Sequence, residues 1–347
     1  MKIKLSQLLG ICFTSLFFSS CTTMLYTNLD VLRPARVAFA PDATKLLIVN
    51  NTVTQPEEYG HKNEFFYQNT KNLKIKTDSL PLFALASLSE ELQSKEFFNE
   101  IVLHANTVNE STDFFTVAPL SPDSVDSLCK HYDVDVVLSL DRLKVNDKIT
   151  ELYHSDVSQY YMALIARYES QWSIHYPGKN EYASVAFKDT IYWDAESYNR
   201  QEVLRTLPNR NDALVDGALY VGQSMVKRLV PYWDKTERYF FSTNNMKMKQ
   251  GIDSVYAKKW DGAIKVWTEA MPKASKGLKA KLANNIAVAY EVKGNIDKAL
   301  EYINISMSFY MNEFFMNKDN FLKVVDYSHQ LNFRKKEIEA LDRQLGQ

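Results

Sequence analysis

The side chains that most often carry catalysis or hold metal ions are scattered through this sequence. The six histidines are His61, His104, His131, His154, His175 and His329. None of them has a second candidate ligand at helical or strand spacing, which a transition-metal site requires. The sequence also lacks a phosphate-binding glycine loop, a His-Glu-x-x-His helix and a Gly-x-Ser-x-Gly turn. We therefore predict that the protein is not an enzyme and uses neither a metal nor a cofactor.

Three aspartates around one predicted strand are the best candidates for a carboxylate cluster. They are Asp133, Asp135 and Asp141. We interpret them as turn residues at strand ends, because aspartate side chains bond readily to nearby backbone groups. An enzyme with its site in the polar stretch 52–77 is an alternative that no motif supports.

The N-terminus predicts export from the cytoplasm. Two lysines precede an apolar stretch, Leu8–Phe18, which is shorter than the roughly 20 residues of a membrane span. The following residues, Phe18-Ser19-Ser20-Cys21, resemble the lipobox of bacterial lipoproteins. The resemblance implies that residues 1–20 are a signal peptide and that Cys21 becomes the acylated, palmitate-bearing N-terminus. An ordinary secretory signal is the alternative.

The residues after Cys21 refine this expected location. No aspartate follows Cys21, and no acidic cluster lies close behind it. By the lipoprotein sorting rule, the resemblance implies a lipid anchor in the outer membrane, with the protein on its periplasmic face. Residues 21–36 are then a lipidated tether.

Cys129 is the cysteine that remains after the other two are assigned. Cys12 leaves with the signal peptide and Cys21 carries the lipid, so a disulfide framework is excluded. Around Cys129, the apolar residues Val125, Leu128 and Tyr132 fall at helical spacing. We therefore expect Cys129 to be a buried core residue, because unpaired cysteine is among the most buried residue types.

The composition is that of a globular protein without an electrostatic target. The chain has 347 residues, of which 46% are hydrophobic and 24% charged, and its net charge is -1. This balance gives no reason to expect nucleic acid as a partner. The length suggests two domains.

Alternating strands and helices predict a mixed-sheet α/β domain over residues 37–241. The predicted elements are strands at 45–51, 101–103 and 134–140, helices at 79–95, 121–133 and 211–233, and a long hairpin of 160–176 and 181–193. This order of elements resembles the domain shared by curli-secretion-type lipoproteins and activators of cell-wall synthases. The pore-forming relatives carry two long hairpins, whereas the pattern here predicts only one.

The C-terminal region, 242–347, predicts helices without strands. Ala287, Tyr290, Gly294 and Ala299 resemble a tetratricopeptide repeat, in which small residues seat the paired helices and glycine ends the first of them. Ala263 matches the same unit one copy earlier. The alternative is a generic helical bundle. The predicted fold class is thus α+β, with an α/β domain followed by an all-α domain of helical hairpins.

We expect these repeats to recruit a protein partner. In related repeats an asparagine on the first helix clamps a peptide backbone, so Asn284, Asn285 and Lys281, one turn earlier, are the candidate contacts. The predicted function is a non-catalytic lipoprotein that acts as a protein-binding scaffold or adaptor in the periplasm. The alternative is a subunit of an oligomeric envelope secretion or transport assembly.

Overall fold

The chain divides into two compact units. The computed structural model describes residues 23–66, 68–311 and 318–346, so the predicted signal peptide and Cys21 lie outside the described residues. We call Pro34–Tyr232 the sheet unit. The described residues up to Arg33, together with Trp233–Arg343, form the helical unit. A mixed sheet followed by a helical region confirms the predicted α+β class.

The sheet unit contains a seven-stranded mixed sheet. Its elements are β2 (Lys45–Asn50), β3 (His61–Glu64), β4 (Lys71–Asn72), α2 (Leu80–Ser94), β5 (Glu100–Thr107), α3 (Pro122–Tyr132), β6 (Val136–His154), β7 (Gln159–His175), β8 (Tyr182–Ser197), α4 (Arg200–Thr206) and α5 (Arg210–Leu229). The strand order is β4-β3-β6-β2-β5, with β7 on the other side of β6 and β8 beyond β7. β2 runs parallel to β5 and β6, while β6, β7 and β8 form an antiparallel meander.

The meander contains two long hairpins where the sequence predicted one. The predicted hairpin is present as β7 and β8, joined through Gly178 at φ 69°. The strand predicted to end at Leu140 continues as β6 to His154 and pairs with β7 along its length. From Lys144 to Thr150 every second residue of β6 is charged or polar, which interrupts the apolar run. This alternation has the period of two residues that is typical of a strand with one solvent-exposed face.

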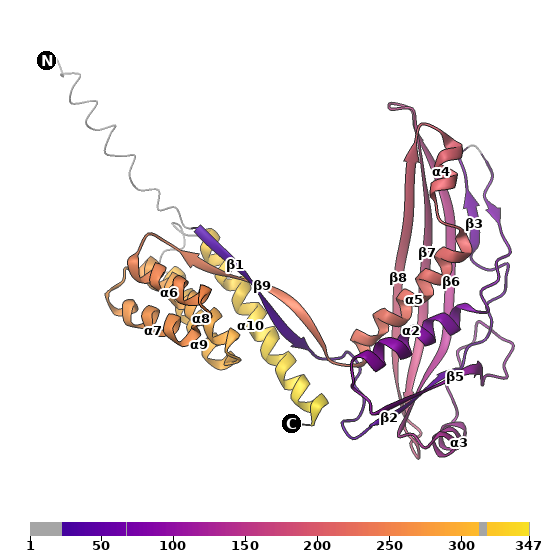
Figure 1. The fold of residues 1–347 in the computed structure, drawn as a ribbon, viewed down its shortest axis with the longest axis horizontal. Helices are drawn as coiled ribbons and strands as arrows, with labels where there is room; N and C mark the ends of the chain where they lie inside the picture. Colours follow the sequence, from indigo (N-terminus) through magenta and orange to yellow (C-terminus); the bar gives the residue numbers. More distant parts are fainter. Residues whose placement is uncertain (1–22, 67, 312–317, 347) are drawn as a thin grey trace. The chain divides into compact units, whose positions relative to one another are not determined.

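Two helices cover one face of the long strands. α2 and α5 lie side by side across β6, β7 and β8 (Figure 1). Their buried residues form one core with the sheet, in which Trp172, Tyr168 and Leu85 are fully enclosed. Ser121 caps α3, with its hydroxyl accepting the Ser124 N–H at 3.2 Å. α3 packs on the opposite face, at the β2 end of the sheet.

Close contact between α2 and α5 depends on a glycine. A Cβ added at Gly222 would lie 2.2 Å from the Ala84 carbonyl oxygen and 2.8 Å from the Leu88 nitrogen, both backbone atoms. We expect Gly222→Ala to destabilise the sheet unit by about 1–3 kcal/mol, because the two helices must move apart. Urea unfolding measures this loss. Gly262→Ala is the control: its Cβ would meet nothing nearer than 3.7 Å, and alanine favours the helix, so stability should stay equal or rise.

A buried ionic cluster fixes β3, within the polar stretch 52–77, to its neighbours. Within that stretch, β3 pairs with β6. His61 Nδ1 lies 2.5 Å from an Asp147 carboxylate oxygen, and Arg210 Nε lies 2.9 Å from the other oxygen. The Gln55 side chain donates to the Val145 carbonyl at 2.7 Å and accepts the Val145 N–H at 2.8 Å. These contacts join β3, β6 and α5.

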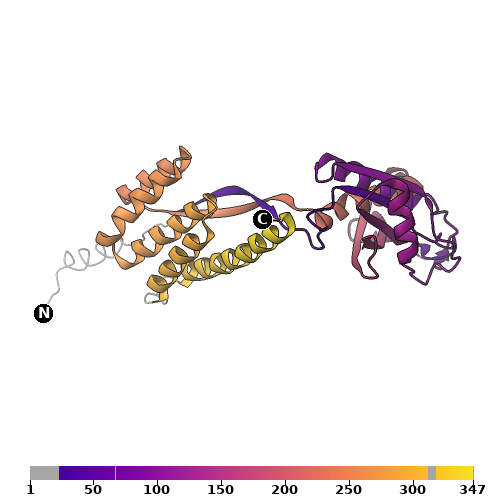
Figure 2. The same cartoon turned by 90° about the horizontal axis from the view of Figure 1, so that it is seen from below.

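The helical unit combines a two-stranded ribbon with five α-helices and a short 3₁₀ helix within the described residues. Its elements are β1 (Thr23–Arg33), β9 (Tyr232–Ser242), α6 (Met246–Tyr256), α7 (Trp260–Ala270), η1 (Met271–Lys273), α8 (Lys276–Val292), α9 (Ile296–Met311) and α10 (Lys318–Leu345). α6 packs on α7, α7 on α8, and α8 on α9. Figures 1 and 2 show α10 running along the ribbon.

The ribbon corrects two predicted boundaries. Residues 23–33, expected within the tether 21–36, form β1 and pair with β9. Residues from Trp233 onward, expected in part to close the α/β domain 37–241, belong to the helical unit. From Tyr26 to Val31, the exposed residues Tyr26, Asn28 and Asp30 alternate with the less exposed Thr27, Leu29 and Val31, which is the period-two pattern of a strand.

Candidate functional site

Helix α5 and the edge strand β8 form the walls of a large hollow in the sheet unit. The Asn209 side chain caps α5 by accepting the Asn211 N–H at 2.9 Å. The buried stripe of α5 packs on the sheet, which leaves Tyr220, Ser224 and Lys227 on the outer side at helical spacing. β8 pairs with β7 and contributes Phe187 and Asp189 to the wall of this hollow.

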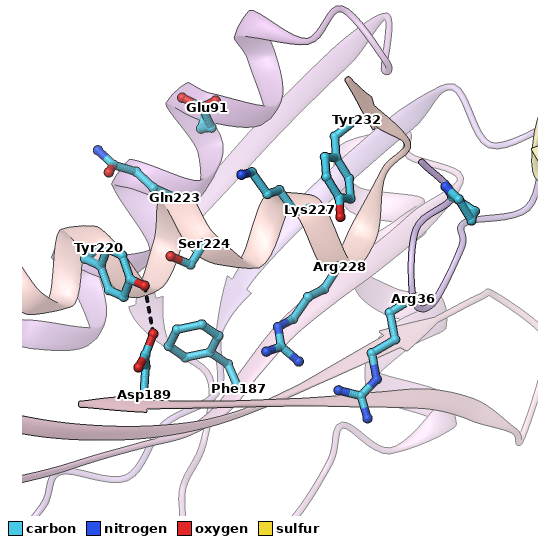
Figure 3. A pocket seen from close by; sticks show the side chains of 11 residues that line it. Arg36, Glu91, Phe187, Asp189, Tyr220, Gln223, Ser224, Lys227, Arg228 and Tyr232 are labelled. Carbon is cyan, nitrogen blue, oxygen red and sulfur yellow. Dashed lines mark hydrogen bonds between the residues drawn. The ribbon is translucent and has the colours of Figure 1, made fainter. Parts of the chain in front are cut away.

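The hollow has a volume of about 720 Å³ and three cations in its wall (Figure 3). It is lined by Pro34, Arg36, Glu91, Phe187, Asp189, Tyr220, Gln223, Ser224, Lys227, Arg228 and Tyr232. Arg36 and Lys227 are exposed, and Arg228 is half-buried. Figure 3 shows the guanidinium groups of Arg36 and Arg228 directed toward the same side of the hollow.

Aromatic rings and one carbonyl hold two of these cations. The Arg228 guanidinium lies 5.1 Å from the centre of the Phe187 ring, and its Nη1 donates to the Ala186 carbonyl at 3.2 Å. Lys227 Nζ lies 5.4 Å from the centre of the Tyr232 ring. These contacts fix position without neutralising charge.

The two carboxylates of the hollow are engaged elsewhere. Glu91 pairs with Lys95 at 2.6 Å. Asp189 accepts the Tyr220 hydroxyl at 2.7 Å and the Thr190 N–H at 2.8 Å. The hydrogen bond to Asp189 is the main cause that raises the pKa of Tyr220, so its hydroxyl stays a donor. Within the described part of the chain, Arg36, Lys227 and Arg228 therefore have no carboxylate partner.

A second hollow continues the first along the seam between α5 and β8. It has a volume of about 410 Å³ and shares Asp189 and Tyr220 with the first. Ile191, Trp193 and Asp216 line its far part. Together the two hollows form a groove that is basic at one end and mainly apolar at the other. We call it the α5–β8 groove.

The sheet unit also contains a serine, a histidine and an aspartate in contact, but their arrangement is structural. Ser139 Oγ donates to Asp141 at 2.7 Å and lies 3.2 Å from His175 Nε2. In a catalytic triad the aspartate orients the histidine and the serine is accessible. Here Asp141 accepts from Ser139, Ser173 and Asn51, and Ser139 is fully buried.

The remaining reactive candidates from the sequence lie apart. Asp133 pairs with Lys45, and Asp135 accepts backbone N–H groups of Thr44 and Lys45, so both serve as turn residues as predicted. The same prediction is wrong for Asp141, which lies buried within β6 rather than at a strand end. Cys129 is buried in the core under α3, and burial raises the pKa of its thiol to about 11. Across the described residues, no three metal-binding side chains come together.

The structure contradicts the predicted partner contacts on the repeats. Asn284 and Asn285 are fully buried and Lys281 is only 8% exposed. Asn285 does clamp a peptide backbone, but that of its own chain: it accepts the Phe241 N–H and donates to the Phe241 carbonyl, both at 2.8 Å. Strand β9 thus occupies the surface predicted for a partner. The sequence does not show this, because β9 was assigned to the other domain.

The predicted repeat residues lie at the helix contacts for which they were chosen. Ala263, Ala287 and Ala299 are fully buried. Gly294 has φ 77° directly after α8, where a left-handed residue ends a helix. Tyr290 stacks on Tyr302, with ring centres 5.5 Å apart. Membership in the tetratricopeptide family stays a prediction.

Comparison with known proteins gives a family but no activity. Residues 43–241 match the model described as Domain of unknown function (DUF8603), and the chain belongs to this family. Residues 249–333 match a second model, Domain of unknown function (DUF6340). No curated protein has a matching sequence. In the described part of the chain, no helix combines the length and apolar character of a membrane span.

Two solved structures are distantly similar. An uncharacterised protein is 11% identical with a TM-score of 0.21, over 56% of this chain and 97% of its own. A neuraminyllactose-binding hemagglutinin homologue from Helicobacter pylori is 9% identical with a TM-score of 0.24, over 55% of this chain and 84% of its own. These values are too low to support an inference about this chain.

Proposed function

We propose that the protein is a non-catalytic, lipid-anchored envelope protein that binds an acidic segment of a protein partner in the α5–β8 groove. The lipid anchor rests on the lipobox-like residues before Cys21, with the periplasmic face of the outer membrane as the expected location. The observation that carries the binding proposal is the group of three cations, Arg36, Lys227 and Arg228, without carboxylate partners in the described residues.

The apolar lining favours a peptide over a simple ion. Phe187, Tyr220 and Tyr232 lie beside the cations, and Ile191 and Trp193 extend the apolar surface. A ligand with carboxylates at one end and apolar side chains at the other therefore matches the groove. From Phe187 to Trp193 the strand spans about 20 Å, the length of roughly six extended residues.

The backbone edge of β8 is not expected to provide the binding surface. The Ala186 carbonyl is already bonded to Arg228, and the Thr190 N–H to Asp189. Side chains that occupy edge groups in this way discourage the addition of another strand. The partner segment is therefore expected to contact side chains in the groove rather than to extend the sheet.

Charge reversal in the groove tests this function. A fluorescent hexapeptide with two glutamates followed by alternating leucine and phenylalanine should bind, and its lysine counterpart should not. Arg36→Glu with Lys227→Glu should weaken binding of the acidic peptide at least about tenfold, since unlike charges become like. Fluorescence anisotropy measures both affinities, and added salt should weaken the binding of the acidic peptide.

The matched control changes the net charge of the protein by the same amount as the groove variant. Lys130→Glu with Arg205→Glu alters two exposed cations outside the groove and should leave the affinity unchanged. Equal binding of the acidic and basic peptides, or equal loss in both double variants, would exclude the groove as an acidic-peptide site. Light scattering of the detergent-extracted protein tests the alternative, in which an oligomeric assembly would show a ring-sized mass.

A further inference from the structure

The face of the sheet opposite α2 and α5 carries a regular array of charged side chains. Cross-strand register places four rows on this face: Lys62, Lys148, Ile165 and Tyr192; Asn146, Arg167 and Thr190; Lys144, Glu169 and Lys188; and Arg142, Gln171 and Ala186. α3 covers this face only at the β2 end. Arg167 and Lys188 retain 47% and 57% of their side-chain exposure, so this part of the face is accessible.

Positive charge exceeds negative charge in these four rows; Asp194 and Glu196 lie on the same face in the next two rows, toward the turn between β6 and β7. Lys62 and Lys148 both pair with Glu64, at 2.5 and 2.7 Å. Glu169 is shared by three cations: Arg167 at 3.2 Å, Lys188 at 3.4 Å and Lys144 at 3.9 Å. Five cations thus share two carboxylates, and three positive charges are unmatched. The hydrogen bond from Lys148 is the main cause that lowers the pKa of Glu64, so that carboxylate stays charged and holds both lysines in place.

A small pocket lies where these cations converge. Its volume is about 280 Å³, and its wall includes Lys62, Lys148, Arg167, Asn146, Thr190 and Ile165. Glu64 and Glu169 stand outside the pocket. Asp147 also lines it, but its side chain is fully buried and its carboxylate is bound by His61 and Arg210, so the other polar side chains of the wall are three cations, an amide and a hydroxyl. Asn146 packs against Gly60, where a Cβ would lie 2.1 Å from its Oδ1, so the close approach of the loop fixes this amide.

We propose that this pocket binds a phosphate group, either free or as the monoester of a sugar. A phosphate carries about -1.5 to -2 charges and several strong acceptor oxygens, which matches three cations better than the single charge of a carboxylate does. Arg167 supplies a planar fork of donors, and the lysines supply point charges. Asn146 and Thr190 add uncharged polar groups for the remaining oxygens or for sugar hydroxyls. The volume accommodates one small anionic group.

This site is distinct from the α5–β8 groove. Lys188 of β8 points to the phosphate face, whereas Phe187 and Asp189 line the groove on the other side of the same strand; Thr190 borders both the pocket and the apolar end of the groove. The cations that carry the two proposals are different residues, and the variants that test one site leave the cations of the other unchanged.

Calorimetric titration of the full chain with two phosphate sources tests the proposal. Inorganic phosphate and glucose 1-phosphate are the probes, and glucose is the neutral comparison. We expect saturable binding of at least one phosphate probe and none of glucose. Tighter binding of the ester identifies a phosphorylated sugar as the source, and equal binding identifies the free anion. Sodium chloride should weaken binding, because the contacts are ionic.

Paired variants assign the binding to the pocket. Lys148→Gln with Arg167→Gln should raise the dissociation constant at least about tenfold. Lys130→Gln with Arg205→Gln, which removes two exposed cations elsewhere, should change it less than about twofold. Circular dichroism establishes that each variant is folded. The absence of saturable phosphate binding, or the same affinity in the pocket variant and the control, would overturn the proposal.

Discussion

Glu291→Ala is expected to lower the free energy of unfolding of the helical unit by about 3–5 kcal/mol. Glu291 receives two bonds from Arg238, both 2.7 Å, and one from the Tyr327 hydroxyl at 2.8 Å. The side chains of Arg238 and Glu291 are only 6% and 4% exposed. Removal of the carboxylate leaves a buried guanidinium without its counter-charge, which costs more than the bonds themselves.

Urea unfolding followed by far-ultraviolet circular dichroism measures this effect, and hydrogen exchange of peptides from 246–311 assigns it to the helical unit. Glu301→Ala is the control, because Glu301 is 59% exposed and 4.0 Å from Lys298; its loss should cost less than about 0.5 kcal/mol. The double variant Arg238→Met, Glu291→Leu should recover most of the stability, since apolar residues replace buried ion pairs well. A Glu291→Ala loss no larger than that of Glu301→Ala would contradict the argument.

The same contact explains why the partner residues were placed on the wrong surface. Arg238 and Phe241 of β9 bind Glu291 and Asn285 of α8, so the ribbon fills the place of a bound peptide. The prediction that an asparagine at this position of α8 clamps a backbone is correct in its chemistry. The identity of the backbone depends on a tertiary contact between segments 44 residues apart, which the local pattern does not contain.

Local patterns predicted most elements of the sheet unit. The helix predicted at 121–133 and the hairpin predicted at 160–176 and 181–193 follow from residue types within a few positions, and both are present, as α3 and as β7 with β8. The helix predicted at 211–233 is present as α5 but ends earlier, at Leu229. The strand predicted at 134–140 is shorter than β6, and no strand was predicted at β1, because the solvent-exposed faces of both strands carry charged or polar residues. A strand that is buried on one face alone has a weaker hydrophobic signal in the sequence than a strand that is buried on both faces.

The α5–β8 groove could be predicted only in part. The spacing of Tyr220, Ser224 and Lys227 on the polar face of a predicted helix is visible in the sequence. Their conjunction with Arg36 and Phe187 is not, because these residues come from segments about 35 to 190 positions away that the fold brings together. Arginine and lysine on a polar helix face are ordinarily solvated, so the sequence alone gave them no special role.

Asp141→Ala is expected to destabilise the sheet unit by about 2–5 kcal/mol. Asp141 accepts hydrogen bonds from Ser173 at 2.6 Å, Ser139 at 2.7 Å and Asn51 at 2.8 Å, and it is only 4% exposed. Without the carboxylate, these buried donors lose a common acceptor, and each unsatisfied donor costs about 1–3 kcal/mol. The substitution also removes the desolvation penalty of a buried carboxylate, and this gain offsets part of the cost.

The pH dependence of Asp141→Asn tests the electrostatic part of this argument. Burial, the largest cause, raises the pKa of Asp141 above its ordinary 3.8, so the folded protein takes up this proton more readily than the unfolded chain. The resulting stabilisation is fully present below pH 3.8 and is lost as the pH rises through the higher folded pKa. The stability of the wild type relative to Asp141→Asn should therefore increase as the pH falls from 7 toward 4, in urea titrations at each pH. His175, whose pKa burial lowers, is present in both proteins, so its own acid destabilisation largely cancels in the comparison. A difference that stays constant or shrinks over this range would show that the carboxylate is not held at a raised pKa.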